Sequence, residues 1–276
     1  MLNYIRQSLR RKKARRVTQE YPPIVKTYHL ENLGPIEFAN WDNPLAPEFV
    51  ITQSNVDFFS KFIKEGDLVI DIGANFGDTT VPMGLSAGVG GLTLGFDPNP
   101  YVFKILEKNS SLNYGKYNLV PLPYAISKEE AEFYFISSEA SFANGGISPT
   151  KDSIHGKFIY PEKIIGIKLS DFLEKEYPDW MSKLSFIKID TEGYDKEIIK
   201  SISDLLAKYK PTLVAESFTK NSDAEKIELY SVIEDLGYDI YYFSDFVMDA
   251  KIVPLKSKSD ITLYKQTINI YATPKP

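Results

Sequence analysis

The sequence predicts an α/β fold built on a mostly parallel β-sheet. From residue 67 onward, short apolar segments alternate with segments of helical periodicity, the pattern of repeated β-α-β units. Two of the apolar segments, LVIDI and FIKI, are apolar on both faces, as strands are when helices cover both sides of a sheet. The chain has 276 residues and 43% hydrophobic side chains, which is enough for one large domain with its own core.

Each expected element follows from its local pattern. Short apolar runs predict strands at residues 68–73, 92–97, 118–126, 184–190, 211–217, 238–243 and 267–273. The segments with helical periodicity predict helices at residues 77–87, 101–112, 196–207 and 223–236. Strands therefore alternate with helices over most of the chain.

Two regions interrupt this alternation. Residues 1–53 contain five prolines and no clear period, so we expect an N-terminal extension ahead of a domain that spans residues 54–276. Ser54 is expected to be the N-cap of a helix that turns a phenylalanine-rich stripe toward the core. Residues 131–169 form an insertion with two expected strands and a polar, glycine-rich centre. We expect this centre to be a long loop that closes over the substrate as a lid.

The composition excludes several classes of site. The formal charge is −5 and the pI is near 5.3, which argues against a nucleic-acid partner. The absence of cysteine removes disulfides, thiolate metal sites and a cysteine nucleophile. His29 and His155 are the only histidines, so a histidine-rich metal cluster is excluded too. No continuous apolar stretch reaches the roughly 18 residues of a membrane span, and we expect a cytoplasmic protein.

Positive charge is concentrated at the N-terminus. Seven basic residues precede the first acid, Glu20, and they are Arg6, Arg10, Arg11, Lys12, Lys13, Arg15 and Arg16. Leu2, Ile5 and Leu9 lie among them at helical spacing. Two interpretations stay open. Residues 1–16 form a basic amphipathic helix that touches an acidic partner or the anionic inner face of a membrane, or they form a solvated, frayed terminus.

The segment DLVIDIGANFGDTT contains the main candidate for a ligand site. Gly73 and Gly77 flank the junction of a strand and a helix, where glycine lets the backbone turn tightly and lets a ligand approach closely. A dinucleotide-binding turn would have glycine at the third and sixth positions, which are Asn75 and Asp78 here. A carboxylate at Asp71 would repel a pyrophosphate and would attract an ammonium or sulfonium cation.

A second acid narrows the ligand further. Asp97 comes twenty residues after Gly77, at the end of the next expected strand, where a carboxylate can accept both hydroxyl groups of a ribose. A cationic ligand with a ribose and no phosphate is S-adenosylmethionine. We therefore expect S-adenosylmethionine as the cofactor, with a nicotinamide-dependent oxidoreductase as an alternative.

These segments resemble the FkbM-type, S-adenosylmethionine-dependent methyltransferases, which have the class I Rossmann-like fold. The resemblance covers roughly residues 65–273 and is carried by VIDIGANFGDTT, FDPNPYVFKILEKNSSLN, YAIS, IKLSDFL, FIKIDTEGYDKEIIKSI, PTLVAES and LGYDIYYF. It implies a three-layer sandwich around a mostly parallel, seven-stranded sheet of order 3-2-1-4-5-7-6, with the last strand antiparallel. Asp97 departs from the glutamate that the family more often has at this position.

The resemblance also implies which residues bind the cofactor. The methionine end should lie in the glycine turn, the ribose at the end of the second strand, and the adenine after the third strand. The residues expected around the methionine end are Asp71, Gly73, Asn75, Gly77 and Thr80. Those expected at the ribose are Asp97, Pro98 and Asn99, and those expected at the adenine are Ala125 and Ile126.

Acidic side chains at the ends of later strands are the candidate catalytic groups. Asp190 falls at the carboxyl end of the strand LSFIKID, Glu192 follows it, and Glu216 closes the next strand. Methyl transfer is an in-line displacement, and a hydroxyl acceptor must lose its proton. Either Asp190 or Glu192 is a general base, or Asp190, Glu192 and Glu216 together hold Mg²⁺ or a similar hard ion. Lys188, on the same strand face as Asp190, either orients the acceptor or neutralises that aspartate.

The acceptor class is narrowed by motifs that the sequence lacks. Without cysteine, the covalent route to cytosine C5 is closed. The segment after the fourth strand reads DTEG, unlike the motif of enzymes that methylate amino nitrogens of nucleic acids. The acidic domain also argues against a basic RNA groove. We therefore expect O-methylation of a hydroxyl on a sugar, glycolipid or natural product, with a non-catalytic S-adenosylmethionine-binding protein as the alternative.

Overall fold

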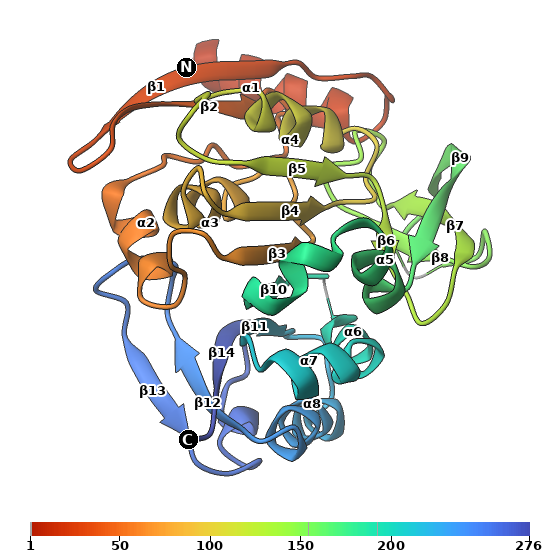
Figure 1. The fold of residues 1–276 in the computed structure, drawn as a ribbon. Helices are drawn as coiled ribbons and strands as arrows, with labels where there is room; N and C mark the ends of the chain where they lie inside the picture. Colours follow the sequence, from red (N-terminus) through yellow and green to blue (C-terminus); the bar gives the residue numbers. More distant parts are fainter. Residues whose placement is uncertain (1, 154, 192) are drawn as a thin grey trace.

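The computed structural model describes residues 2–153, 155–191 and 193–276, and its centre is an eight-stranded sheet (Figure 1). In sheet order the strands are β13 (Ile252–Leu255), β12 (Tyr238–Phe243), β14 (Ile268–Pro274), β11 (Thr212–Ser217), β10 (Leu184–Ile189), β3 (Leu68–Ile72), β4 (Leu92–Phe96) and β5 (Leu119–Leu122). From β5 to β11 all neighbours are parallel, and β14 runs antiparallel to β11 and β12. The strand order 3-2-1-4-5-7-6 is thus confirmed.

The eighth strand, β13, was not expected. It pairs antiparallel with β12 at the edge of the sheet and carries Pro254. Proline has no N–H group to donate, so its position is compatible with an edge strand and weakens the strand signal in the sequence.

Helices cover both faces of the sheet, which confirms the three-layer sandwich. One face carries α2 (Gln53–Ser60), α3 (Thr80–Ala87) and α4 (Phe103–Ser110). The other face carries α5 (Leu169–Glu176), η1 (Pro178–Lys183), α6 (Asp195–Ser201), α7 (Ser203–Tyr209), α8 (Asp223–Asp235) and η2 (Ile261–Leu263). Strand β3 shows the division. Its residues Leu68, Ile70 and Ile72 pack on the α5–α8 side, whereas Val69 packs against α2 and α3.

The expected cap of α2 and one expected continuous helix differ from the structure, and α3 starts at Thr80 rather than at Gly77. Helix α2 starts at Gln53 with Thr52 as its N-cap, so the expected cap at Ser54 is wrong by two residues. The side chain of Asn55 completes a capping box with Thr52, a role that Glu or Gln usually fills. The single helix expected at residues 196–207 is two helices, α6 and α7. The Ser201 hydroxyl donates to the Ile198 carbonyl (2.7 Å), which competes with the helical ladder at the break.

The N-terminal residues form helix α1 (Leu2–Ala14) and a hairpin of β1 (Pro23–Leu30) and β2 (Gly34–Trp41), at the top of Figure 1. The hairpin packs on α4 through a fully buried asparagine, Asn109. Its side chain accepts the Ala39 N–H (2.8 Å) and donates to the carbonyls of Ala39 (2.9 Å) and Phe76 (2.6 Å). Phe38 is buried in the same cluster as Phe76. The hairpin therefore shares a core with the helices beside the glycine turn.

The insertion contains more regular structure than expected. A second sheet has the order β6-β9-β7-β8, with β6 (Ala125–Ile126), β9 (Phe158–Ile167), β7 (Ala131–Ser137) and β8 (Gly146–Ser148). Strand β8 lies inside the segment that we expected to be an unstructured loop. Whether this segment moves as a lid stays a prediction.

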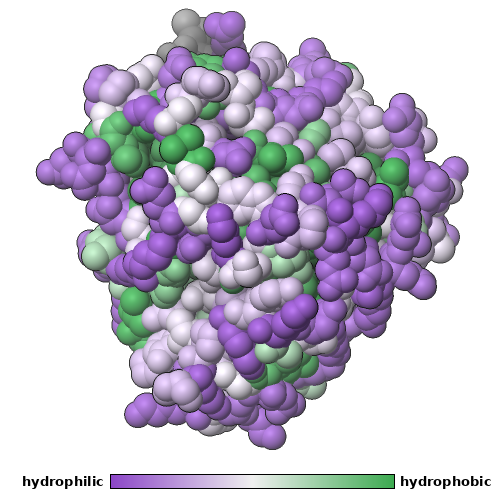
Figure 2. Space-filling model, in the orientation of Figure 1, coloured by the Kyte–Doolittle hydropathy of each residue, from purple (hydrophilic) through white to green (hydrophobic). Residues whose placement is uncertain are grey.

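On the face drawn in Figure 2, hydrophobic residues form separate patches among hydrophilic ones. Within the described ranges, no helix combines the length and the apolar character that crossing a bilayer requires.

Candidate active site

The glycine turn after β3 touches the end of β10. Gly73 and Gly77 have positive φ angles of 81° and 100°, and Asn75 between them has φ 50°. The N–H groups of Gly73 and Ala74 both donate to the Phe96 carbonyl at 2.9 Å, which joins the turn to β4. A Cβ atom at Gly73 would lie 1.9 Å from the carbonyl oxygen of Asp190. Only glycine fits at this position, so the turn and Asp190 are held in contact.

Asp97, at the end of β4, lies directly beside this turn. One carboxylate oxygen accepts the Asn75 N–H (2.7 Å) and the other accepts the Asn99 N–H (2.8 Å). Burial raises the pKa of Asp97 to about 7, although these two N–H groups lower it. Each oxygen keeps a further lone pair, which is what two ribose hydroxyl donors require. The donor–acceptor chemistry of Asp97 therefore fits the expected cofactor.

This pKa gives a testable pH dependence. The carboxylate form binds hydroxyl donors, so we expect the affinity for S-adenosylmethionine to fall about tenfold from pH 8 to pH 6 as Asp97 takes up a proton. The stability of the ligand-free protein responds in the opposite direction. Because the folded pKa lies above the usual 3.8, this group stabilises the fold fully below about pH 4, and that stabilisation is lost as the pH rises through about 7.

Calorimetric titration with S-adenosylmethionine across this pH range measures the effect. The variant Asp97→Asn should bind more weakly at every pH and show a flat profile. A variant profile as steep as that of the wild type would assign the titration to another group and contradict the prediction.

Lys188 forms the centre of a buried charge cluster. Its Nζ lies 3.1 Å from Asp71 and 3.4 Å from Asp190, and the side chain is almost completely buried. Burial alone would lower the pKa of Lys188, but the carboxylates of Asp71, Asp190 and Asp78 together raise it above its ordinary value. Of the two interpretations of Lys188, this geometry favours neutralisation of Asp190.

Asp71 is more enclosed than the sequence suggested. The side chain is fully buried and accepts hydrogen bonds from the hydroxyls of Thr79 (2.9 Å) and Thr80 (2.7 Å) as well as from Lys188. Thr80 is fully buried as well, and its hydroxyl is used in this contact. Asp71 and Thr80 thus stabilise the turn from its buried side. Their direct contact with a cofactor stays a prediction.

Asp78 is a functional candidate that the sequence interpretation missed. It is half-buried at the start of α3, and burial raises its pKa to about 6, with Lys188 opposing the shift and Asp71 and Asp190 adding to it. Three carboxylates thus lie around one ammonium group, which leaves the site suited to a cationic ligand. The sequence does show an acid here, in the segment FGDTT. The sequence interpretation used Asp78 only as evidence against a dinucleotide-binding turn.

One predicted ribose residue, Asn99, and one predicted adenine residue, Ala125, both adjoin the insertion near Phe142. The Asn99 side chain donates to the carbonyl of Phe142 (2.8 Å), which ties the residues after β4 to the insertion. Pro98 is half-buried between Asp97 and Asn99. Ala125 and Ile126 are buried in β6, and the Ile126 side chain packs in the main core. Ile126 can therefore offer a ligand little more than its backbone.

Asp195, a second residue that the sequence interpretation missed, joins the ends of β10 and β11. It accepts hydrogen bonds from the Thr191 N–H (3.1 Å), the Thr191 hydroxyl (2.8 Å) and the Glu216 N–H (2.9 Å). Burial raises the pKa of Asp195 to about 6 despite these donors. Asp195 thereby connects Thr191 to the end of β11.

The predicted metal set is only partly described. Glu192, a member of both catalytic hypotheses, lies outside the described residues. In the part of the chain that the structure describes, no group of three or more Asp, Glu, His or Cys side chains is arranged to hold a metal ion. Asp190 is instead paired with Lys188. The metal version has no support from these residues, and the role of Glu192 stays a prediction.

A cleft of about 400 Å³ opens beside Asp78. Two of its walls, the turn after β3 and the loop after β12, follow the carboxyl ends of strands that run in the same direction, at the edge where α/β sheets bind ligands. The residues before and in α2 close it. Its lining consists of Phe49, Val50, Thr52, Asn55, Phe59, Asp78, Thr79, Asp245, Phe246 and Val247. Aromatic, hydroxyl and acidic groups thus line a space that borders Asp78 and Thr79, directly after the glycine turn.

The chain matches the family model of the methyltransferase FkbM domain over residues 71–240, more than half of its length. It therefore belongs to the FkbM methyltransferase family, and its sheet has the class I methyltransferase order.

One curated relative is the hexuronic acid methyltransferase AglP of Haloferax volcanii, which is 29% identical over 143 residues. The match covers 52% of this chain and 53% of the relative, so the chain spans about half the length of the curated relative it matches.

Two solved structures are also similar to this chain. A methyltransferase FkbM from Methylobacillus flagellatus has 12% identity and a TM-score of 0.47, over 78% of this chain and 47% of that one. A SAM-dependent O-methyltransferase from Thermotoga maritima has 12% identity and a TM-score of 0.45, over 91% and 78% of the two chains. Similarity at this level bears on neither substrate nor mechanism.

Proposed function

We propose that this protein is an S-adenosylmethionine-dependent O-methyltransferase that acts on a hydroxyl group of a neutral sugar, glycolipid or related natural product. The observation that carries the proposal is the cleft beside Asp78, which lies directly after the glycine turn and has aromatic and hydroxyl-bearing walls. Aromatic side chains supply apolar area for the faces of sugar rings, and the carboxylates of Asp78 and Asp245 supply hydrogen-bond acceptors.

The charges around the turn support the cofactor assignment. Asp71, Asp78 and Asp190 surround the single ammonium of Lys188, and Asp97 lies on the other side of the turn. When bound there, S-adenosylmethionine supplies a methyl carbon on a positively charged sulfur. Transfer of this methyl group to the acceptor oxygen would break the C–S bond, would leave its electron pair on sulfur, and would require a group that takes the acceptor's proton. In this arrangement Asp97 binds the ribose and Asp78 faces the cation.

Asp190 is our candidate for the group that takes the acceptor proton. Its side chain is 44% exposed, whereas Lys188 and Asp71 beside it are buried. An exposed carboxylate next to the cofactor turn can reach a hydroxyl, and general bases of this kind contribute about 10²–10⁴-fold to rate. The ion pair with Lys188 holds the Asp190 side chain in position.

The acidity of the cleft points to an uncharged acceptor. Asp78 and Asp245 contribute carboxylates, and the described residues that line the cleft include no Lys, Arg or His. A hexuronic acid, the substrate in the name of the relative AglP, would bring a further negative charge. Like charges in such a confined space repel each other, so a neutral sugar fits better.

Labelled methyl transfer tests the proposal. Wild-type protein is incubated with labelled S-adenosylmethionine and paired acceptors, a hexoside and the matching hexuronoside, with and without EDTA. We expect transfer to the hexoside to be at least about tenfold faster, and EDTA to have no effect. Asp245→Asn should reduce the difference in transfer rate between the two acceptors. Asp249 is an exposed residue of the same loop that does not line the cleft, so Asp249→Asn should leave this difference unchanged.

The outcomes separate the parts of the proposal. Faster methylation of the hexuronoside would overturn the neutral acceptor. If EDTA abolished activity and added Mg²⁺ restored it, the hypothesis that acidic residues hold a metal ion would be favoured. Tight cofactor binding without transfer to any acceptor in a broad panel would favour a non-catalytic protein.

A further inference from the structure

Helix α1 is attached to the protein body through its polar face. Gln7, Arg10 and Arg11 line a groove of about 260 Å³ between α1 and the β1–β2 hairpin, and Ala14 is fully buried. Arg10 pairs with Asp42 (3.0 Å), and Arg11 Nε donates to the Pro44 carbonyl (3.3 Å). These contacts fix the direction in which the opposite face of the helix points.

The face that points away from the body is apolar. Ile5 and Leu9 lie one helical turn apart, about 40° from each other around the axis and roughly opposite Gln7 and Ala14. They are 47% and 61% exposed, although helices on globular proteins normally turn such residues toward the core. The amphipathic order of α1 is thus inverted, and no described part of this chain covers the stripe.

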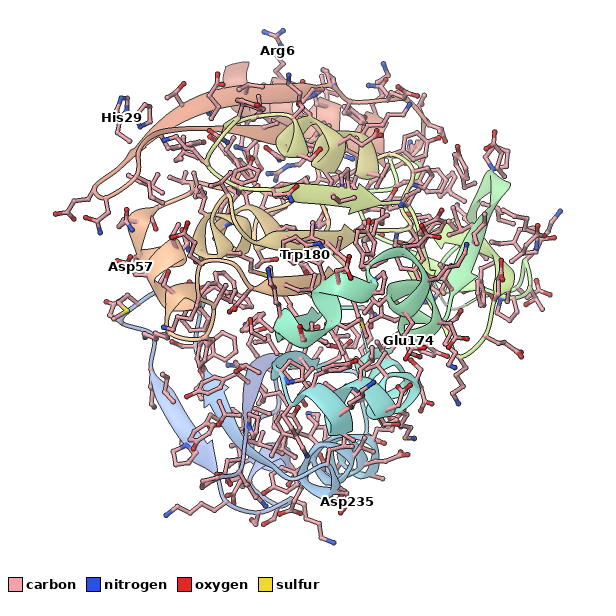
Figure 3. The ribbon with its side chains drawn as sticks, in the orientation of Figure 1. Arg6, His29, Asp57, Glu174, Trp180 and Asp235 are labelled. Carbon is pink, nitrogen blue, oxygen red and sulfur yellow. The ribbon has the colours of Figure 1, made fainter. Side chains whose placement is uncertain are left out.

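Cations flank this apolar stripe. Lys12 and Lys13 continue it toward the C-terminus of the helix, and Arg6 projects away from the body at the top of Figure 3. Among the described residues, none of Arg6, Lys12, Lys13 and Arg16 forms an ion pair, and all four are exposed. The formal charge is +7 over residues 1–19 and −5 over the whole chain, which leaves −12 for the remainder.

We propose that α1 docks the protein flat on an anionic lipid bilayer. Ile5 and Leu9 enter the boundary between headgroups and acyl chains, and Arg6, Lys12, Lys13 and Arg16 contact lipid phosphates. Apolar side chains bordered by cations are the pattern of helices that lie in the membrane interface. A nucleic acid or an acidic protein surface would attract the cations and gain little from the two aliphatic side chains. The acidic remainder is repelled by the same surface, so only the α1 face can approach it.

Co-sedimentation with lipid vesicles tests the proposal, independently of the methyl acceptor. The full chain is mixed with vesicles of phosphatidylcholine alone or of phosphatidylcholine with phosphatidylglycerol. We expect binding to the mixed vesicles and little binding to phosphatidylcholine alone. Ile5→Ser with Leu9→Ser, and Lys12→Glu with Lys13→Glu, should each weaken binding at least about tenfold.

Matched control variants make the same chemical changes elsewhere. Val89→Ser removes a comparably exposed aliphatic side chain, and Lys256→Glu with Lys258→Glu reverses two exposed lysines outside α1. Both should bind like the wild type. We expect all variants to fold, because Arg10, Arg11 and Ala14, which attach α1 to the protein body, are unchanged. Circular dichroism and the melting temperature verify this.

Three outcomes would overturn the docking proposal. The first is that the wild type fails to bind the mixed vesicles, and the second is that it binds both kinds of vesicle equally. The third is that the serine variant binds like the wild type while the glutamate variant does not. The last result would mean attraction by charge alone, as expected for an acidic protein or a nucleic acid partner.

Discussion

Asp190→Asn is expected to lower the turnover number by about 10²–10⁴-fold while changing the dissociation constant of S-adenosylmethionine by less than about threefold. Asparagine keeps the shape of the side chain and can still contact Lys188, but it cannot take a proton. The effect should therefore fall on the chemical step. Single-turnover kinetics give the rate of that step, and calorimetry gives the cofactor affinity.

Two further variants locate the effect. Asp235→Asn changes an exposed acid at the end of α8, just before β12 begins and at the bottom of Figure 3, and should leave both quantities unchanged. Asp78→Asn should mainly weaken cofactor affinity. If Asp190→Asn reduced affinity and turnover equally, Asp190 would be a binding residue. If it reduced neither, the base would be Asp78 or Glu192.

Gly73→Ala is expected to destabilise the fold by about 3–5 kcal/mol. Its Cβ atom would lie 1.9 Å from the carbonyl oxygen and 2.9 Å from the carbonyl carbon of Asp190, and these backbone atoms cannot rotate away. The positive φ of 81° adds the strain of a left-handed conformation, about 1–2 kcal/mol. Urea denaturation followed by circular dichroism measures the change.

Gly115→Ala is the matched control. Gly115 has nearly the same φ, 78°, but an added Cβ would meet no atom within 4 Å. This substitution should cost only the conformational strain, about 1–2 kcal/mol. Equal losses of stability in the two variants would show that β3 and β10 do not approach each other as closely as the structure has them.

Much of the fold could be predicted because its signals are local. The runs LVIDI and FIKI are apolar on both faces and lie in the centre of the sheet, as β3 and β10. The strand order needed the family resemblance, since apolar periodicity says nothing about which strands are neighbours. The N-terminal hairpin gave no signal because most residues of β1 are exposed, so no apolar alternation marks the strand.

Candidate site residues could be singled out from the sequence where one residue type serves one purpose. Gly73 and Asp97 stood out because a tight turn requires glycine and a strand end displays its acid. Asp195 gave no such signal, because its importance lies in contacts with Thr191 and Glu216, the latter 21 positions away. Asp78 was visible in the sequence, but its burial and its position beside Lys188 come only from the folded arrangement.

The buried Asn109 links the hairpin and the glycine turn in a single cooperative unit. Its side chain bonds to Ala39 in the hairpin and to Phe76 in the turn, so separating the two would leave several backbone groups without partners in an apolar setting. The β1–β2 hairpin and the glycine turn therefore support each other structurally. Heating should melt them together with the sheet, in one transition.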